Sequence, residues 1–98
     1  MKIQLKGNWT TRQVWLNSKA LSPSKSQKIW NHSPDGFNWG YIGSGPAQLA
    51  LAILYDVTKN REASVRLHQK FKFDIISGWG DKWEITESEV REWLINQQ

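Results

Sequence analysis

The sequence has no cysteine, only three prolines and no long apolar run. Without cysteine there is no disulfide scaffold, no thiolate nucleophile and no cysteine-based zinc site, so the fold must depend on packing and hydrogen bonds. The longest nearly apolar stretch, residues 47–55, is too short to span a membrane, and the first residues lack the apolar segment of a signal peptide. We therefore expect a cytoplasmic protein without a membrane partner.

Acidic side chains are missing from the first third of the chain. Residues 1–34 carry six basic and no acidic side chains, whereas residues 35–98 carry seven basic and nine acidic ones. The molecule is therefore expected to be electrically lopsided, which bears on its partners more than on its fold. The length of 98 residues and the hydrophobic content of 39% fit one small domain over 1–98. Its basic strand and loop half is residues 1–36, and the other elements follow in 37–98.

Short alternating patterns predict strands. The pairs Ile3/Leu5 and Val14/Leu16 alternate with polar or opposite-facing residues, which is typical of strands with one buried face. Three aromatics at alternate positions predict a further strand over 37–42 with all three on one face. Two more short strands are expected at 28–31 and 83–85.

Two connecting segments have characteristic compositions. The run of serine, lysine and glutamine over 22–27 has no apolar anchor, so we expect an exposed, mobile loop there. Ser33–Gly36 is expected to form a tight turn, because proline suits its second position and glycine its last.

Helical patterns dominate the second half of the chain. A helix is predicted over Ala47–Val57, with Pro46 at its first position, and its apolar residues go nearly all the way round, which indicates a central, buried helix. A second helix is expected from about Arg61 to Ile76, although alternating apolar residues near its end also fit an extended segment. Thr86 and Glu89 form a capping box that starts a third helix. The apolar residues that this last helix is expected to bury are Val90, Trp93 and Leu94.

Together these elements predict an α+β fold. The sheet is expected to be small and antiparallel, built from the N-terminal strands and the strand at 37–42. It packs against two or three helices, led by the helix at 46–57.

Residues 31–54 read NHSPDGFNWGYIGSGPAQLALAIL. This stretch resembles the signature of a small family of uncharacterised domains encoded by phages, plasmids and bacteria, and so long a match is specific. The segments Phe71-Lys72 and Trp83-x-Ile85-Thr86-x-x-Glu89-Val90-x-x-Trp93-Leu94 resemble the rest of the pattern, so the resemblance covers roughly residues 10–95. It implies a fold unit and a mobile-element context but no known activity. One departure is Ile42, where the pattern has a further glycine.

The run Gly43-Ser44-Gly45 places a glycine-rich turn at the start of the central helix. Backbone N–H groups and the helix dipole can hold a nucleotide, phosphate or carboxylate there. However, the run lacks the lysine and hydroxyl of a P-loop, and Pro46 removes one donor. A tight turn capped by Ser44 or Gly45 explains the same residues. Gln48, one turn into the helix, either reaches a ligand at this turn or bonds back to the loop.

His32 and Asp35 put an imidazole and a carboxylate close together beside the predicted turn, which is suitable chemistry for acid–base catalysis. The same residues also make an ordinary hydrogen-bonded turn, and no further nucleophile or base is marked by its spacing. His68 lies in the second predicted helix without any metal-binding spacing around it. We therefore expect a solvated or half-buried His68, and neither a metal nor a cofactor.

Basic and aromatic side chains are interspersed in the first third of the chain. The residues concerned are Lys6, Trp9, Arg12, Trp15, Lys25, Lys28 and Trp30. Such a mixture is typical of nucleic-acid grooves, where cations hold phosphates and aromatics stack on bases. A solvated basic face over a tryptophan-filled core predicts the same pattern. Trp39, between Phe37 and Tyr41, is likewise either a core residue or a stacking platform, and the core is the better interpretation in so small a domain.

Three functions remain open. The first is a non-enzymatic protein-binding module that docks on an unidentified protein partner with an exposed aromatic or apolar patch. The second is a binder of an anionic ligand, either nucleic acid along residues 1–34 or a nucleotide at the 43–46 turn, whose affinity must fall with salt. The third is an enzyme that uses His32 and Asp35. The small size and the lack of catalytic spacing favour the first.

Overall fold

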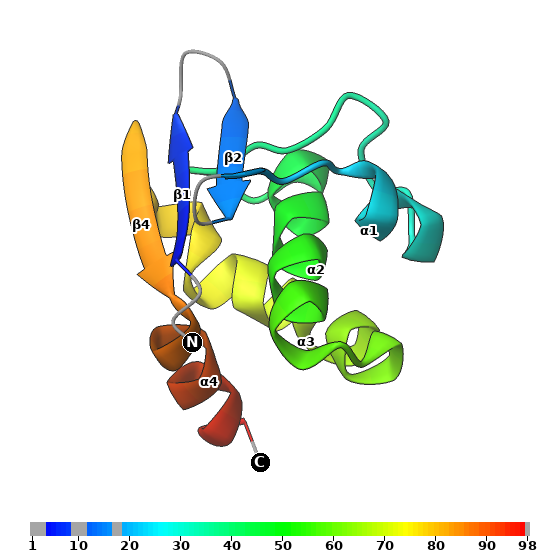
Figure 1. The fold of residues 1–98 in the computed structure, drawn as a ribbon, viewed down its shortest axis with the longest axis vertical. Coiled ribbons are helices and arrows are strands. Elements are labelled where there is room, and N and C mark those ends of the chain that lie inside the picture. The colour runs from blue at the N-terminus through cyan, green and yellow to red at the C-terminus, as the bar shows by residue number, and fades with distance from the viewer. Residues whose placement is uncertain (1–3, 9–11, 17–18, 98) are drawn as a thin grey trace.

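The computed structural model describes residues 4–8, 12–16 and 19–97, which form an α+β fold with one antiparallel sheet (Figure 1). The strands are β1 (Gln4–Asn8), β2 (Gln13–Leu16), β3 (Lys19–Ala20) and β4 (Lys82–Thr86), in the spatial order β3-β2-β1-β4. The helices are α1 (Ser24–Ile29), α2 (Ser44–Thr58), α3 (Arg61–Asp74) and α4 (Glu87–Ile95), with a 3₁₀ turn, η1 (Ile76–Gly78), between α3 and β4.

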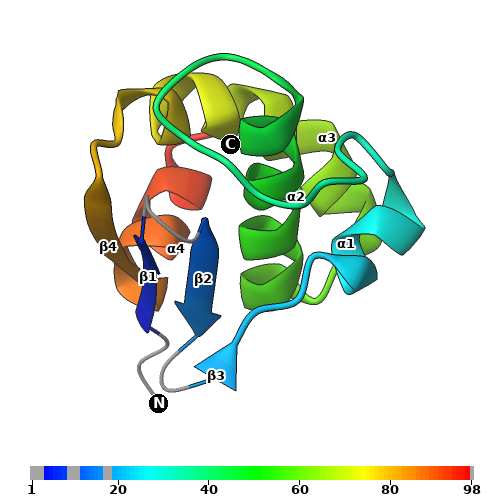
Figure 2. The ribbon, with the colours of Figure 1, turned by 90° about the horizontal axis from the view of Figure 1, so that it is seen from above.

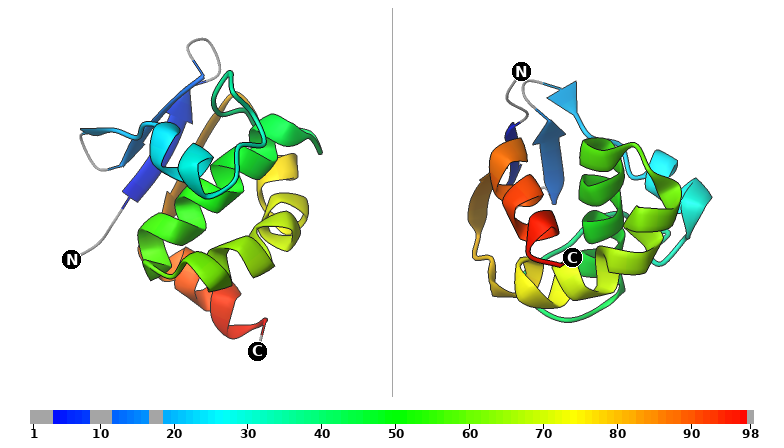
Figure 3. Two further views of the ribbon diagram at one scale, coloured as in Figure 1. Left: turned by 90° about the vertical axis from the view of Figure 1, so that its right-hand side faces the viewer. Right: turned by 90° about the horizontal axis from the view of Figure 1, so that it is seen from below.

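The helices cover only one face of the sheet. Figure 2 and the left-hand view of Figure 3 show the strands along one side of the molecule and the long helices on the other. Leu5, Val14 and Ile85 point inward from three neighbouring strands and are buried, whereas Lys6 and Glu84 are exposed. This period of two is what a sheet with one covered face requires. Its opposite face is left uncovered by the described part of the chain.

Helix α2 is the centre of the core. All residues from Gly45 to Leu54 are buried, which confirms the prediction of a helix surrounded on most sides. The helix begins at Ser44, two residues earlier than Pro46, its predicted first position. Helix α3 packs along it and remains helical to Asp74, so the extended alternative for its end is wrong.

The predicted strand at 83–85 is confirmed as β4, and the capping box is confirmed at the start of α4. Thr86 Oγ1 accepts the N–H of Glu89 at 3.1 Å, and the Glu89 carboxylate accepts the N–H of Thr86 at 3.2 Å. Val90 is buried as predicted, while Trp93 and Leu94 pack partly buried against the core. Strand β4 also corrects the predicted sheet, because it takes the place beside the N-terminal strands that residues 37–42 were expected to hold.

Residues 37–42 are not a strand but an extended loop. Phe37 and Trp39 are buried, yet Tyr41 is 45% exposed, so the three aromatics do not share a face. The anchor of the loop is Trp39, whose indole N–H donates to the carbonyl of Gly80 at 2.9 Å. Trp39 is therefore a core residue, as the sequence favoured, but its neighbours reach the core without pairing in the sheet.

Helix α1 replaces both the loop predicted at 22–27 and the strand predicted at 28–31. Its first turn closes on Pro23, whose carbonyl accepts the N–H of Gln27 at 2.9 Å and the hydroxyl of Ser26 at 2.9 Å. Ser26 is only 2% exposed. A buried serine, rather than an apolar side chain, thus anchors this helix, and for that reason the apolar pattern missed it.

The tight turn predicted at Ser33–Gly36 is confirmed. Gly36 donates its N–H to the Ser33 carbonyl at 3.2 Å and has a φ of +106°, which glycine adopts without strain. The two N-terminal strands are confirmed as β1 and β2, although Ile3, expected in the first of them, lies outside the described residues.

Strand β1 needs a glycine where Trp83 packs against it. Gly7 pairs with Trp83 across the strands, and a Cβ at Gly7 would lie 2.4 Å from the indole nitrogen of Trp83. The Trp83 ring is itself stacked on Trp79, with ring centroids 3.9 Å apart, and meets Trp39 edge-on at 5.6 Å. The indole is held from both sides, so it cannot make room for a larger residue on β1.

We predict that Gly7→Ala lowers the free energy of unfolding by about 1–3 kcal/mol, the usual cost of overpacking a core. Gly80→Ala is the matched control, because an added Cβ there meets nothing within 4 Å, and it should change stability by no more than ~0.5 kcal/mol. Urea unfolding followed by circular dichroism measures both. Equal stabilities of the two variants would contradict the packing of Trp83 on β1.

Candidate functional site

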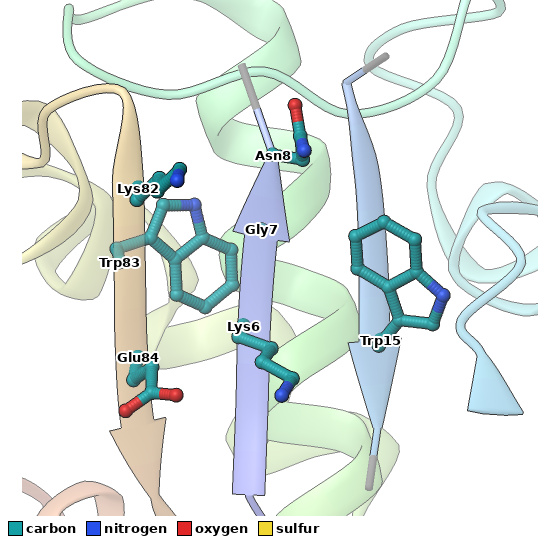
Figure 4. A pocket seen from close by; sticks show the side chains of 7 residues that line it. All are labelled: Lys6, Gly7, Asn8, Trp15, Lys82, Trp83 and Glu84. Carbon is teal, nitrogen blue, oxygen red and sulfur yellow. The ribbon is translucent and has the colours of Figure 1, made fainter. Parts of the chain in front are cut away.

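The uncovered face of the sheet carries the first candidate surface, which we call the sheet groove. Its lining residues are Lys6, Gly7, Asn8, Trp15, Lys82, Trp83 and Glu84 (Figure 4). The strand register sets Lys6 opposite Trp15 on one side and Glu84 on the other. Since residues directly opposite one another project from the same face, these three side chains lie together on the outer face of the sheet.

The sheet groove combines two tryptophans, the partly exposed Trp15 and the buried Trp83, with charges of both signs. Figure 4 shows Lys6 between Trp15 and Glu84, with Asn8 and Lys82 toward the other end of the groove. An indole face offers stacking and apolar contact, and the ammonium groups of Lys6 and Lys82 attract acidic groups of a ligand. This arrangement is suited to holding an extended or planar ligand across the strands.

Gln48, in the second turn of α2, is completely buried and uses both ends of its side-chain amide. Its Oε1 accepts the backbone N–H of His32 at 2.8 Å and that of Ser33 at 3.0 Å. Its Nε2 donates to the Ser26 hydroxyl at 2.9 Å and to the Trp30 carbonyl at 3.2 Å. An amide has two donors and two acceptor lone pairs, so these four bonds occupy it fully. The segment from Ser26 to Ser33 is thereby fixed to α2.

This fixed segment brings His32 against His68 of α3, and we call these two residues the histidine pair. Their Nε2 atoms are 2.8 Å apart. Nδ1 of His68 lies 2.6 Å from the carbonyl oxygen of Val65, and because a carbonyl can only accept, this nitrogen carries a hydrogen. In neutral His68 the Nε2 atom is then the acceptor, so the Nε2–H of His32 is the donor.

Trp30 covers the histidine pair from the solvent side. Its indole stacks on His32 with ring centroids 4.4 Å apart and meets His68 edge-on at 5.5 Å. Burial lowers the pKa of both imidazoles, the His68 ring lowers that of His32 further, and the Lys72 ammonium lowers both. Backbone hydrogen bonds act in the opposite direction on the pKa of His68 but do not outweigh its burial. The pair is therefore held neutral near pH 7.

The two residues predicted for acid–base catalysis, His32 and Asp35, have different surroundings. The ring of His32 is hydrogen-bonded to the ring of His68, whereas Asp35 is exposed in the tight turn. His68 is 1% exposed, so the expectation of a solvated or half-buried side chain is wrong. The reason is tertiary, because the residues that cover it, Trp30 and His32, come from a segment far earlier in the chain.

The glycine-rich run forms the N-terminus of α2, with Gly43 rather than Ser44 or Gly45 as the N-cap. A Cβ at Gly43 would lie 2.5 Å from the Tyr41 ring, and one at Gly45 would lie 2.6 Å from Cβ of Asn38. Gly45 is thus required by the close approach of the preceding loop, whereas a side chain at Gly43 would displace only the exposed ring of Tyr41. The presence of Gly45 is explained by packing without any ligand at the turn.

The residues predicted to bind nucleic acid are divided between two surfaces. Lys6 lies in the sheet groove, whereas Lys25 and Lys28 are exposed on α1 and Trp30 directly follows that helix. Figures 1 and 2 show α1 on the far side of α2 from β1 and β4. Arg12 directly precedes β2, with a left-handed backbone of φ +57°. Their closeness in sequence had suggested one basic surface, but the fold places Lys6 and the α1 residues on different parts of the molecule.

Large apolar side chains are exposed at several places in the described residues. They are Trp30, Tyr41, Ile42, Phe73 and Ile95, with exposed fractions between 45% and 67%. A docking module was expected to expose aromatic or apolar side chains, and these residues do so from the loops before α2 and from the helices α3 and α4. Trp9, which the sequence analysis grouped with the basic and aromatic residues of the first third of the chain, lies outside the described residues.

The sequence analysis grouped Trp15 with other aromatic and basic residues but did not place it on the outer face of the sheet, and it did not pair His68 with His32. The outward orientation of Trp15 had a signal, because it alternates with Val14 and Leu16, the apolar pair that predicted the strand. The pairing of His68 had none, because its partner lies 36 residues earlier and no local spacing joins the two. Across the described residues, no three histidine, aspartate or glutamate side chains gather to hold a metal ion, and no helix there is long and apolar enough to cross a bilayer.

Fold and surfaces together define a small α+β domain with an open-faced antiparallel sheet. The chain belongs to a family of unknown function (DUF6166), whose sequence profile matches residues 5–96. Neither the curated proteins nor the solved structures contain a match to it. Family membership therefore gives a fold unit without an activity, and the function has to be argued from the surfaces.

We predict that Gln48→Leu lowers the free energy of unfolding by about 2–6 kcal/mol, because it leaves two backbone N–H groups without an acceptor at roughly 1–3 kcal/mol each. The matched control is Gln69→Leu on the exposed side of α3, where the change should stay within ~0.5 kcal/mol. Urea unfolding of both variants measures the difference. A Gln48→Leu protein as stable as the control would show that the buried amide does not hold the loop.

Proposed function

We propose that the chain is a non-enzymatic protein-binding module that docks its partner on the sheet groove, as a cytoplasmic accessory domain of a phage or other mobile element. The observation that carries the proposal is the uncovered sheet face with a partly exposed tryptophan, Trp15, in its groove. Aromatic surfaces rimmed by polar groups are typical of protein interaction sites. The mobile-element context comes from the resemblance of residues 31–54.

The composition of the sheet groove supports docking rather than chemistry. Tryptophan is among the residues that contribute most to binding when a partner covers them. Lys6 lies beside Trp15, and Lys82 and Glu84 lie across β1 from it, so the groove carries charges of both signs. Charges at a rim orient a partner more than they add affinity. An extended partner segment lying across β1 would contact the tryptophan and these charges together.

We predict that Trp15→Thr weakens binding of the protein partner. Loss of a central aromatic costs about 2 kcal/mol or more, which is roughly a 30-fold loss of affinity, and threonine keeps a high strand propensity. The tagged chain is used to capture proteins from a lysate of its host, the captured protein is identified by mass spectrometry, and its affinity is measured by surface plasmon resonance for each variant.

Phe73→Ala is the control for this experiment. Phe73 is 62% exposed on α3, away from the groove residues, and its removal should leave the affinity within about twofold of the unchanged chain. Circular dichroism establishes that both variants are folded. A Trp15→Thr protein that binds as the unchanged chain does, or an equal loss in both variants, would argue against docking at the groove.

A second candidate function is favoured by the two lysines of the groove. Lys6 lies beside Trp15, and Lys82 lies on β4 at the opposite side of the groove. In proteins that bind single-stranded nucleic acid, cations hold the phosphates and aromatic rings stack on the bases. In this alternative the groove binds an anionic ligand instead of a protein.

We predict for this alternative that the double variant Lys6→Gln, Lys82→Gln reduces the salt dependence of oligonucleotide binding. Each lost phosphate contact lowers the slope of log K against log salt by about 0.7 for a single strand, so the slope should fall by about 1.4. Fluorescence anisotropy of a labelled oligothymidine between roughly 50 and 200 mM salt measures it. The control is Lys25→Gln, Lys28→Gln on α1, and a slope that falls only in this control would rule out the groove.

A further inference from the structure

The histidine pair holds a single hydrogen between its two facing nitrogens. Nδ1–H of His68 donates to Val65, so the 2.8 Å contact combines the Nε2–H of His32 with the bare Nε2 of His68. One added proton goes to Nδ1 of His32 and leaves this bond in place, now charge-assisted. A second added proton can bind only at Nε2 of His68, the last ring nitrogen without a hydrogen. There it faces the Nε2–H of His32. Two opposed N–H groups repel at this distance, so the second proton breaks the bond.

The groups around the pair oppose its charging. From α3, the Lys72 ammonium acts on both rings, and His68 itself is 1% exposed. From α2 comes the neutral amide of Gln48, bonded to the backbone of His32. From α1 comes Lys28, exposed in its last turn, and the indole of Trp30 follows it. Burial and the Lys72 charge both lower the pKa of the imidazoles, so they accept protons only below their ordinary value of 6.5.

We propose that the histidine pair is a two-proton latch for the surface around Trp30. With fewer than two added protons, the latch holds His32 and Trp30 against α3. With two, the His32 ring leaves His68, and Trp30 loses its stacking partner and presents its full face to solvent. The backbone stays in place, because Gln48 holds the N–H groups of His32 and Ser33 independently of the rings. The acid-triggered change is therefore confined to one patch.

The latch also determines how stability depends on pH. Because folding lowers the pKa of both imidazoles, the folded state binds fewer protons than the unfolded state once the pH falls below about 6.5. The stabilising contribution of the neutral pair is complete above that pH and is lost as the pH falls through the lowered values. The His32–His68 bond breaks at the acid end of this pH range, because breaking it requires the second proton.

An NMR titration of the whole chain from about pH 7.5 to 4.5, across the ordinary histidine range, tests the latch. The imidazole signals and the indole N–H signals are followed together. We expect the pair to take up its first proton while the Trp30 signal stays unchanged, and the Trp30 signal to shift in step with the second proton. Trp39, buried in the core, reports unfolding of the whole domain and should stay constant. A Trp30 shift that follows the first proton, or that moves together with Trp39, would overturn the proposal.

His32→Gln is the matched variant, because its amide still donates to His68 but takes up no proton in this range. The Trp30 signal should stay flat in this variant, and a transition like that of the unchanged chain would reject the latch. Lys72→Gln is a second variant that leaves the hydrogen bond of the pair intact. Removing this ammonium should shift both titration steps to higher pH, and an unchanged opening pH would equally contradict the proposal.

Discussion

The buried amide of Gln48 is the constraint on which the loop surface of this domain depends. Its four hydrogen bonds join α2 to α1 and to the segment that follows α1. Since each partner left unsatisfied in the interior would cost about 1–3 kcal/mol, that segment has one favoured arrangement. The arrangement sets Trp30 on the surface and brings His32 to His68. An apolar side chain could fill the same space, but without hydrogen bonds it would not favour one position of the loop over another.

Elements with an apolar period were predictable, and elements held by polar contacts were not. The helix-forming composition of α2, the apolar spacing of α3 and the capping box of α4 identified the helices, because propensity, burial and capping act within a few residues. Helix α1 was missed because its buried anchor is Ser26. The strand expected at 37–42 was wrong for a different reason: alternation reports an extended backbone with one buried side, but not which neighbour satisfies its N–H and C=O groups.

The same distinction applies to the candidate sites. Alternation along β2 predicts that Trp15 points away from the face of Val14 and Leu16. Half of the sheet groove could therefore be predicted once the strand was recognised. Its other half comes from Lys82 and Glu84, and their position depends on the pairing of β4 with β1. The histidine pair depends entirely on the packing of the Trp30–Ser33 segment between α2 and α3. Sequence spacing placed His32 with Asp35, its near neighbour, because tertiary contacts leave no trace in local spacing.

Strand β1 pairs with one strand that follows it directly and with another from the far end of the chain, as the pairs Gly7 with Val14 and Gly7 with Trp83 show. The edge of β1 that faces β4 is therefore complete only after residues 82–86 have paired with it. An unpaired strand edge offers its backbone groups to other chains. Contacts so distant in sequence form slowly, so the interval before β4 pairs is the one in which this edge is most exposed to pairing with another chain.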